Sequence, residues 1–85
     1  MVEKLSLNVE IVPLNIEHNF LIPSDMSVEN ATALIVKTIL DEYPGVKHSP
    51  SVTHLLVQAS TGKILSSKFS FRQLGIIQGE KIILM

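Results

Sequence analysis

One helix-forming segment between two groups of strand-like segments constrains the fold of this chain more than any other feature. The segment runs from about Val28 to Glu42; Ser27 before it is suited to cap the helix, and Pro44-Gly45 after it stops the helix. Its apolar side chains recur at helical spacing as one stripe, Val28, Ala31, Ile35 and Ile39, flanked by Leu34, Val36 and Leu40. A helix with so wide an apolar side needs a sheet to cover it.

Two strands are expected before this helix. Apolar and polar residues alternate from Leu5 to Ile11, which is the pattern of a half-buried strand. Pro13 and Asn15 then favour a turn, and residues 16–22 return to β-type composition before Pro23. The two runs predict an antiparallel hairpin that ends at Pro23.

The segments after the helix predict the rest of a mixed sheet. "PGVKHSPSVT" is typical of a loop, "HLLVQAS" and "KIL" of two strands joined by the turn "STGK", "SFRQLG" of one helical turn, and "EKIILM" of a final strand. Gly75 and Gly79 suit the corners before that strand. The expected order is ββαββ, a short helix and β. This order predicts an α+β fold in which a mixed sheet of four to five strands packs on one long helix.

Length, composition and charge exclude several classes of protein. A chain of 85 residues with 46% apolar residues is expected to form one domain over residues 1–85. Its net charge of −1, without a basic cluster, argues against nucleic-acid binding. The N-terminal alternation argues against a cleaved signal, and no apolar run is long enough for insertion into a membrane. The absence of cysteine fits a reducing compartment and excludes thiol chemistry.

No group of residues predicts catalysis or the binding of a cofactor or metal. His18, His48 and His54 have no metal-binding spacing, and no Gly-x-Ser-x-Gly motif is present. The glycines lie at separate corners, without the spacing of a phosphate-binding loop. We therefore expect neither an enzyme nor a bound cofactor.

The outer face of the sheet is the main candidate site. Strand alternation is expected to turn Leu5, Leu7, Val9, Ile11, Leu55, Val57, Ile82 and Leu84 toward the helix, and Ser6, Asn8, Glu10, Leu56, Gln58, Lys81, Ile83 and Met85 outward. Leu56, Ile83 and Met85, extended by Leu14 at the hairpin tip, would then form an exposed apolar patch that binds a protein partner. A homodimer that covers this patch and incidental exposure are the alternatives. The helix flank with Val36 and Leu40 is a second candidate surface.

Several segments resemble proteins of the ubiquitin-like, or β-grasp, fold. "IPSDMSVENATALI" is similar to the stretch of ubiquitin that leads into its helix, and "TGKIL" and "QLGIIQGEKIILM" resemble its turn-strand and closing strand. The passage "FRQLGIIQGEKIIL" also resembles the small bacterial YukD and EsaB proteins, with Glu80 in place of the commoner Asp. This resemblance implies a cytoplasmic, non-enzymatic accessory of type VII secretion. It would dock on the secretion ATPase or on a membrane component and be recruited to the inner face of the membrane.

The last residues depart from the conjugated members of this fold. Ubiquitin and the related sulfur carriers act through a tail that ends in Gly-Gly, whereas this sequence ends in "KIILM". We therefore expect neither conjugation nor sulfur transfer for the sequence as given, unless a longer precursor exists. The alternative function is a small structural or regulatory subunit of a multicomponent enzyme such as an oxygenase, because β-grasp proteins also occur in such complexes.

Overall fold

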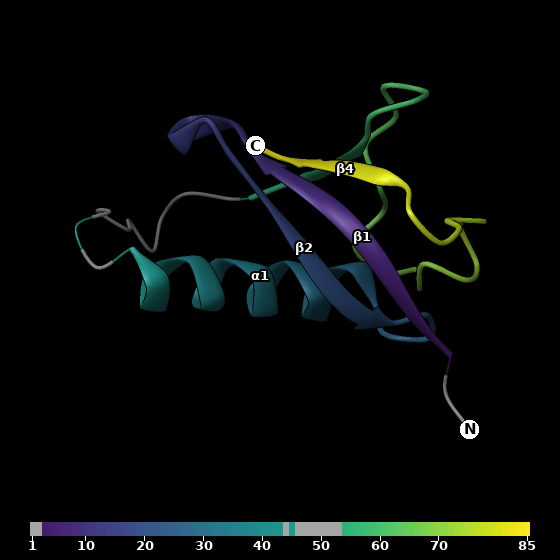
Figure 1. The fold of residues 1–85 in the computed structure, drawn as a ribbon. Coiled ribbons are helices and arrows are strands. Elements are labelled where there is room, and N and C mark those ends of the chain that lie inside the picture. The colour runs from purple at the N-terminus through teal and green to yellow at the C-terminus, as the bar shows by residue number, and fades with distance from the viewer. Residues whose placement is uncertain (1–2, 44, 46–53) are drawn as a thin grey trace.

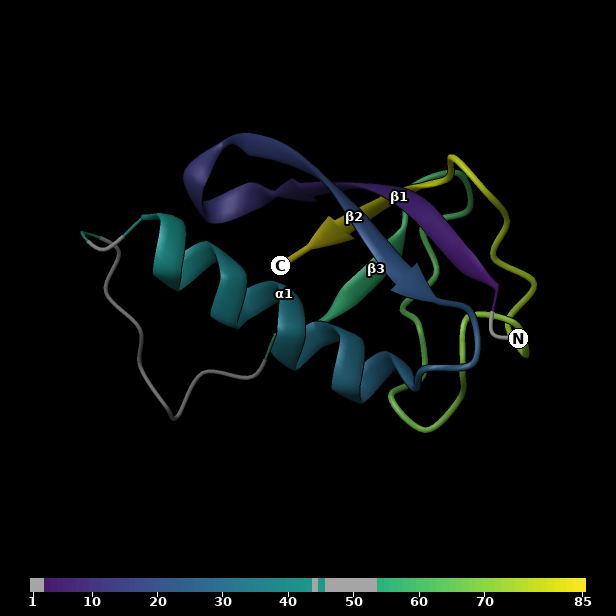
Figure 2. The ribbon, with the colours of Figure 1, turned by 60° about the horizontal axis from the view of Figure 1, so that its bottom comes forward.

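A four-stranded mixed sheet packs on one helix in this computed structural model, which describes residues 3–43, 45 and 54–85. The elements in chain order are β1 (Lys4–Ile11), the 3₁₀ helix η1 (Val12–Leu14), β2 (Ile16–Pro23), α1 (Val28–Glu42), β3 (Leu56–Gln58) and β4 (Lys81–Leu84). The strand order is β2-β1-β4-β3, with β1 and β4 parallel and the other neighbours antiparallel. Figures 1 and 2 show α1 lying along one face of the sheet. The other face is here called the outer face.

The first hairpin forms as the alternation predicts. β1 and β2 pair over their whole length, from Lys4 opposite Pro23 to Ile11 opposite Ile16. Asn15 closes the connection in the left-handed conformation at φ 53°, which asparagine tolerates better than most residues. Every second side chain of β1 is buried against the helix side. An eight-residue strand with this pattern leaves little freedom in its register, because a slip by one residue would expose the whole apolar set.

The helix has the bounds and the cap that the sequence predicts. α1 runs from Val28 to Glu42, and the Ser27 hydroxyl accepts a hydrogen bond of 3.2 Å from the backbone N–H of Asn30. Glu29 lies in the first turn, where the positive end of the helix dipole favours a carboxylate. The buried side chains of α1 are the predicted stripe: Val28, Ala31, Ile35 and Ile39.

The core lies between α1 and the inner face of the sheet. Its buried members are Leu5, Leu7, Val9, Ile11, Ile22, Val28, Ala31, Ile35, Ile39, Leu56, Leu65, Phe71, Ile76, Ile82 and Leu84. Phe71 is the largest of the fully buried side chains and comes from the segment between β3 and β4. This irregular segment therefore contributes to the core as the strands and the helix do.

The expected facing of β3 is wrong. Leu56, predicted to point outward, is only 1% exposed and belongs to the core, whereas Leu55, predicted to face the helix, is 41% exposed. The cause is the pairing with β4, which places Leu56 opposite the buried Leu84 and Val57 opposite Ile83. Residues that are directly opposite in a sheet point to the same face. Leu56 therefore follows Leu84 inward, and Val57 follows Ile83 outward.

The connection from β3 to β4 is less regular than expected. The "KIL" segment makes only an isolated bridge, between Ile64 and Val57, and "SFRQLG" forms a hydrogen-bonded turn instead of a short helix. Gly75 and Gly79 have φ angles of 74° and 82°, so both occupy the left-handed region that favours glycine. The predicted loop over residues 44–53, with His48, lies outside the described residues apart from residue 45.

Candidate interaction surface on the outer face of the sheet

Apolar side chains gather on the β3–β4 half of the outer face. Val57 is opposite Ile83 in the ladder, and it also forms the bridge with Ile64. Leu55 and Met85 continue the same face, because each donates a backbone hydrogen bond to the other, at 3.3 and 3.0 Å. We call these side chains the apolar patch: Leu55, Val57, Ile64, Ile83 and Met85. Ile64 is 63% exposed, and Leu55 and Met85 are exposed as well, so a partner can reach them.

The structure keeps two of the four predicted patch residues on the surface of this half. Ile83 is partly buried at the centre of the apolar patch, and Met85 is exposed at its end. Leu56 cannot belong to a surface, because its side chain points to the helix side of the sheet and is buried in the core. Leu14 is partly buried and packs against the core, and its neighbour Val12 is the exposed apolar residue of the hairpin tip. The tip lies near the C-terminal end of β4 (Figure 1).

Sequence reasoning missed Leu55, Val57 and Ile64 as surface residues. The segment "HLLVQ" is ambiguous, because either choice of inward face places one of its two leucines in the core. Its composition alone therefore does not determine which side chains face outward. Pairing with the final strand does decide it, because Ile82 and Leu84 are both buried and their β3 partners must point the same way.

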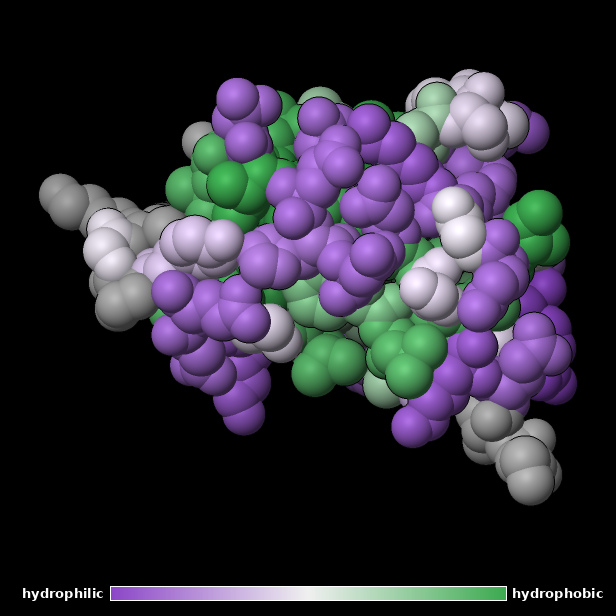
Figure 3. Space-filling view, in the orientation of Figure 1, coloured by the Kyte–Doolittle hydropathy of each residue, from purple (hydrophilic) through white to green (hydrophobic). Residues whose placement is uncertain are grey.

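The β1–β2 half of the outer face is mainly polar instead, with Leu21 as an exposed apolar residue near its end. Lys81 Nζ lies 3.2 Å from Glu17 Oε1 and 3.8 Å from Glu10 Oε2, and the Asn8 amide donates to Glu17 Oε2 at 3.3 Å. The hydrogen bond from Lys81 is the main reason that the pKa of Glu17 is lowered, followed by the one from Asn8. The same bond to Glu17 raises the pKa of Lys81. In Figure 3 a hydrophilic band crosses the molecule, with hydrophobic surface on either side of it.

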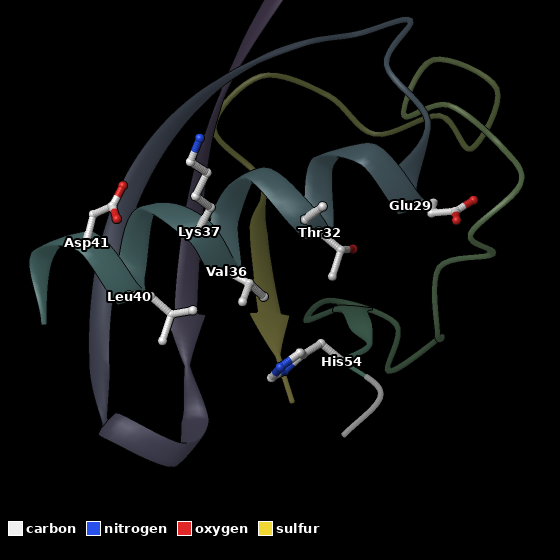
Figure 4. Close-up of a pocket in the computed structure, with 8 residues that line it drawn as sticks. Glu29, Thr32, Val36, Lys37, Leu40, Asp41 and His54 are labelled. Atoms are coloured by element: carbon white, nitrogen blue, oxygen red, sulfur yellow. The ribbon is translucent and has the colours of Figure 1, made fainter. Parts of the chain in front are cut away.

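A second, helix-side surface contains the other predicted apolar residues. A pocket of about 480 Å³ is lined by Glu29, Thr32, Ala33, Val36, Lys37, Leu40, Asp41 and His54. Figure 4 shows Thr32, Val36 and Leu40 projecting from the side of α1 that faces His54. The predicted flank with Val36 and Leu40 thus lines a real depression. Charged side chains lie along it as well, so it is less apolar than the patch on the sheet.

His18 and His54, the two histidines within the described residues, lie apart from each other and have different surroundings. His18 Nε2 lies 2.9 Å from the Tyr43 hydroxyl and 3.6 Å from Glu42 Oε2, which ties β2 to the C-terminal end of α1. His54 lies in the helix-side pocket, and His48 lies outside the described residues. Among the described residues no group of three or more histidine, aspartate or glutamate side chains is placed to hold a metal ion.

Glu80, the residue before β4, makes hydrogen bonds that stabilise the local structure. Its carboxylate accepts hydrogen bonds from the Gln58 amide at 2.6 Å and from the backbone N–H of Ile77 at 3.2 Å. It therefore joins the turn before β4 to β3.

Within the part of the chain that the structure describes, no helix is long and apolar enough to span a bilayer.

Comparisons with known proteins identify the fold. No protein-family model matches the sequence, and no curated protein matches it. Among solved structures, the EccD5 ubiquitin-like domain from Mycobacterium xenopi is similar with a TM-score of 0.77 and 9% identity, over 98% of this chain and 93% of that one. A chain of the ESX-5 inner membrane complex has a TM-score of 0.80 and 11% identity, over 98% of this chain and 21% of its own length.

The ubiquitin-like domain of an Arabidopsis thaliana protein is similar as well, with a TM-score of 0.72 and 14% identity, over 99% of this chain and 78% of that one. Identities this low concern the fold alone. The chain therefore has a ubiquitin-like α+β fold, as its element order predicts.

Proposed function

We propose that this chain is a non-catalytic protein-interaction module of a bacterial, type VII-like secretion system, related to the YukD and EsaB proteins. In this proposal residues 1–85 form a single domain. It works in the cytoplasm and is recruited to the membrane by docking on the secretion ATPase or a membrane component. The observation that carries the proposal is the apolar patch on a sheet face that no element of the described chain covers.

The composition of the apolar patch suits a protein partner. Val57 and Ile83 form a floor that is largely or partly buried, and Leu55, Ile64 and Met85 stand exposed around it. A partner that buried one such exposed side chain fully would gain roughly 1.5–3 kcal/mol. Glu10, next to Ile83 in the ladder, and Lys81 supply charges at the border of the patch. An apolar centre with a charged border is the usual organisation of a specific protein interface.

The similarity to secretion components supports this choice of system. The EccD5 domain and the chain of the ESX-5 inner membrane complex both share the fold over nearly all of this sequence. That chain provides a precedent for this fold within an inner membrane complex. The sequence resemblance of the β4 region to YukD and EsaB points to the same system.

A binding measurement with two patch variants tests the proposal. The purified chain is titrated with the cytosolic part of the secretion ATPase and, separately, with detergent-solubilised membrane components of the same machine. Ile64→Ser and Met85→Ser change exposed side chains and should leave the fold intact. Each should weaken binding roughly tenfold or more, because the side chain no longer contributes buried apolar area.

Ile77→Ser is the matched control. Ile77 is 67% exposed, against 63% for Ile64, but it lies in the turn before β4 and outside the apolar patch. This variant should bind as the unaltered chain does. Equal binding by all variants would exclude the patch as the docking surface, whereas no binding to any component of the machine would exclude the secretion role.

A further inference from the structure

One edge of the sheet, formed by β2, has backbone N–H and C=O groups that no other described strand pairs with. β2 is the first strand in the order β2-β1-β4-β3, so only one of its sides is paired. The opposite edge strand, β3, is better protected, because Gln58 and Leu56 exchange backbone hydrogen bonds with the segment at Lys63 and Leu65. An open edge strand is a ready template for pairing with another strand.

The hydrogen-bond pattern identifies which residues of β2 face this open edge. The Ser24 N–H donates to the Glu3 carbonyl at 2.7 Å, in line with the register that pairs Lys4 with Pro23. Hydrogen-bonded and non-hydrogen-bonded pairs alternate in an antiparallel ladder, so Ile22, Phe20, His18 and Ile16 direct their backbone groups to β1. Glu17, Asn19 and Leu21 direct theirs away from β1. No backbone hydrogen bond to these three residues on the open side is present within residues 3–43, 45 and 54–85.

We propose that this edge pairs with β2 of a second copy of the chain, antiparallel and centred on Asn19. In this register Asn19 lies opposite Asn19 of the second copy, and Glu17 lies opposite Leu21. Each residue contributes its outward N–H and C=O, so every free backbone group of the three is used. The pairing is self-complementary, as a two-fold symmetric interface requires.

Other registers use the edge less well. Centring on Glu17 places like carboxylates opposite each other, which destabilises a strand pair. Centring on Leu21 places Asn19 opposite Pro23, which has no N–H to donate, and its carbonyl already accepts from Met26 at 3.0 Å. Centring on His18 or on Phe20 leaves one of the outward residues without a hydrogen-bonding partner. Only the register centred on Asn19 avoids all of these losses.

The side chains on the helix side of β2 favour the same partner. His18 and Phe20 are only partly buried, whereas the β1 residues opposite them, Val9 and Leu7, are fully buried. In the proposed register His18 of one copy lies opposite Phe20 of the other, so two incompletely covered rings meet at each end. On the outer face the charge of Glu17 is already balanced by Lys81 at 3.2 Å. The second copy therefore brings no unpaired charge toward it.

The pairing has a consequence for the apolar patch. A two-fold axis perpendicular to the sheet at Asn19 would join the two sheets into one and leave both outer faces on the same side. The patch lies on the β3–β4 half, at the far side of β1 from this edge, so it stays uncovered. A dimer would thus present two equal patches to one partner surface, which raises apparent affinity through a higher effective concentration.

A proline substitution tests the edge directly. Asn19→Pro removes the central outward N–H, and edge strands tolerate proline where the N–H faces away from the sheet. Sedimentation equilibrium of the full chain, up to ~1 mM, should show a dimer for the unaltered chain and a monomer for this variant. Phe20→Pro is the matched control for facing, because it removes an N–H that β1 uses and should unfold the hairpin. Circular dichroism reports folding in each case.

Two charged variants test the register without proline. Leu21 is 62% exposed, so Leu21→Lys and Leu21→Glu should both fold. Each places its new charge opposite Glu17 of the second copy, twice in the symmetric dimer. The dimer dissociation constant of the Glu variant should exceed that of the Lys variant by roughly 4- to 1000-fold, since each opposite pair changes from repulsive to attractive.

The proposal is overturned if the unaltered chain stays monomeric over the whole concentration range, even if β2 takes up an extended peptide of another protein instead. It is also overturned by a dimer that Asn19→Pro leaves intact, or by equal dissociation constants for the two Leu21 variants. A chain that stays monomeric can still bind a partner through Ile64 and Met85, and a dimer can form without that partner, so the two proposals fail independently.

Discussion

The two halves of the outer face offer different things to a partner. On the β3–β4 half, Leu55, Ile64 and Met85 expose apolar side chains around the less exposed Val57 and Ile83. The backbone of β3 is paired on both sides. On the β1–β2 half, Asn8, Glu10 and Glu17 are polar and bound to one another or to Lys81, while the backbone of β2 is open along its edge. One half can therefore recognise through side chains and the other through main-chain hydrogen bonds.

The difference follows from how each half is built. β1 and β2 are eight residues long and pair with each other along their full length. β3 has three residues and β4 has four, and both depend on neighbours that are distant in sequence. The β1–β2 half is therefore built from one continuous local ladder, whereas the β3–β4 half is assembled from pairings between segments that lie far apart along the chain.

The largest expected effect comes from the two neighbouring leucines of the β3–β4 half. Leu56→Ala should reduce the free energy of unfolding by about 2–5 kcal/mol, because it leaves a cavity beside Leu84 in the core. Leu55→Ala should change it by no more than about 0.5 kcal/mol, since the side chain is largely in solvent. Urea denaturation of both variants measures the difference. A larger loss for Leu55→Ala than for Leu56→Ala would mean that β3 faces the other way.

Sequence patterns predict the β1–β2 half and the helix well. The alternation from Leu5 to Ile11 repeats often enough to determine the facing by itself, and Ser27 and Pro23 mark the ends of elements correctly. Each of these signals acts within a few residues along the chain. Local signals of this kind are what a single sequence contains in readable form.

The facing of β3 could not be predicted in the same way. Three residues do not establish an alternation, and the bridge to Ile64 forms only because the chain turns back at Gly62, where φ is 72°. The facing is determined by the pairing with Ile83 and Leu84, which come 26–28 residues later in the chain. The prediction of Ile83 and Met85 as surface residues needed only the alternation of the final strand, and it placed them correctly.

A second prediction concerns Ile83, where the two halves meet. Ile83 lies between Glu10 of β1 and Val57 of β3 in the ladder. Ile83→Lys and Ile83→Glu both remove a partly buried apolar side chain and should each destabilise the fold by about 1–3 kcal/mol. The Glu variant should be the less stable by a further ~0.2–1 kcal/mol, because it places like charges opposite each other.

Thermal or urea unfolding of the two Ile83 variants at pH 7 provides this comparison. Repeating it with Glu10→Gln in the background isolates the opposite residue, since the difference between the Lys and Glu variants should then shrink. If the difference persists unchanged in that background, Glu10 is not the neighbour that distinguishes them.

The smallest expected effect lies in the polar half and concerns Glu17. Its pKa is lowered from the ordinary value of 4.5, chiefly by the hydrogen bond from Lys81. Lys81→Met should return the pKa of Glu17 toward 4.5, as followed by NMR titration of the carboxyl carbon. Lys63→Met, which changes an exposed lysine in the β3–β4 connection, is the control and should leave the pKa of Glu17 as it is.

The lowered pKa of Glu17 also fixes the direction of a small pH dependence. A carboxyl group whose pKa is lower in the folded than in the unfolded chain stabilises the folded chain at pH values above its unfolded pKa. This contribution is lost as the pH falls through its folded pKa. Lys81 acts in the opposite pH range, because its pKa is raised in the folded chain. Its contribution to stability is present below pH 10.5 and is lost as the pH rises through the folded pKa of Lys81. Lys81→Met should therefore weaken the loss of stability on acidification below pH 4.5. Both groups are exposed, so added salt should reduce the difference between this variant and the unaltered chain. A difference that grew with salt would contradict an ion pair as its cause.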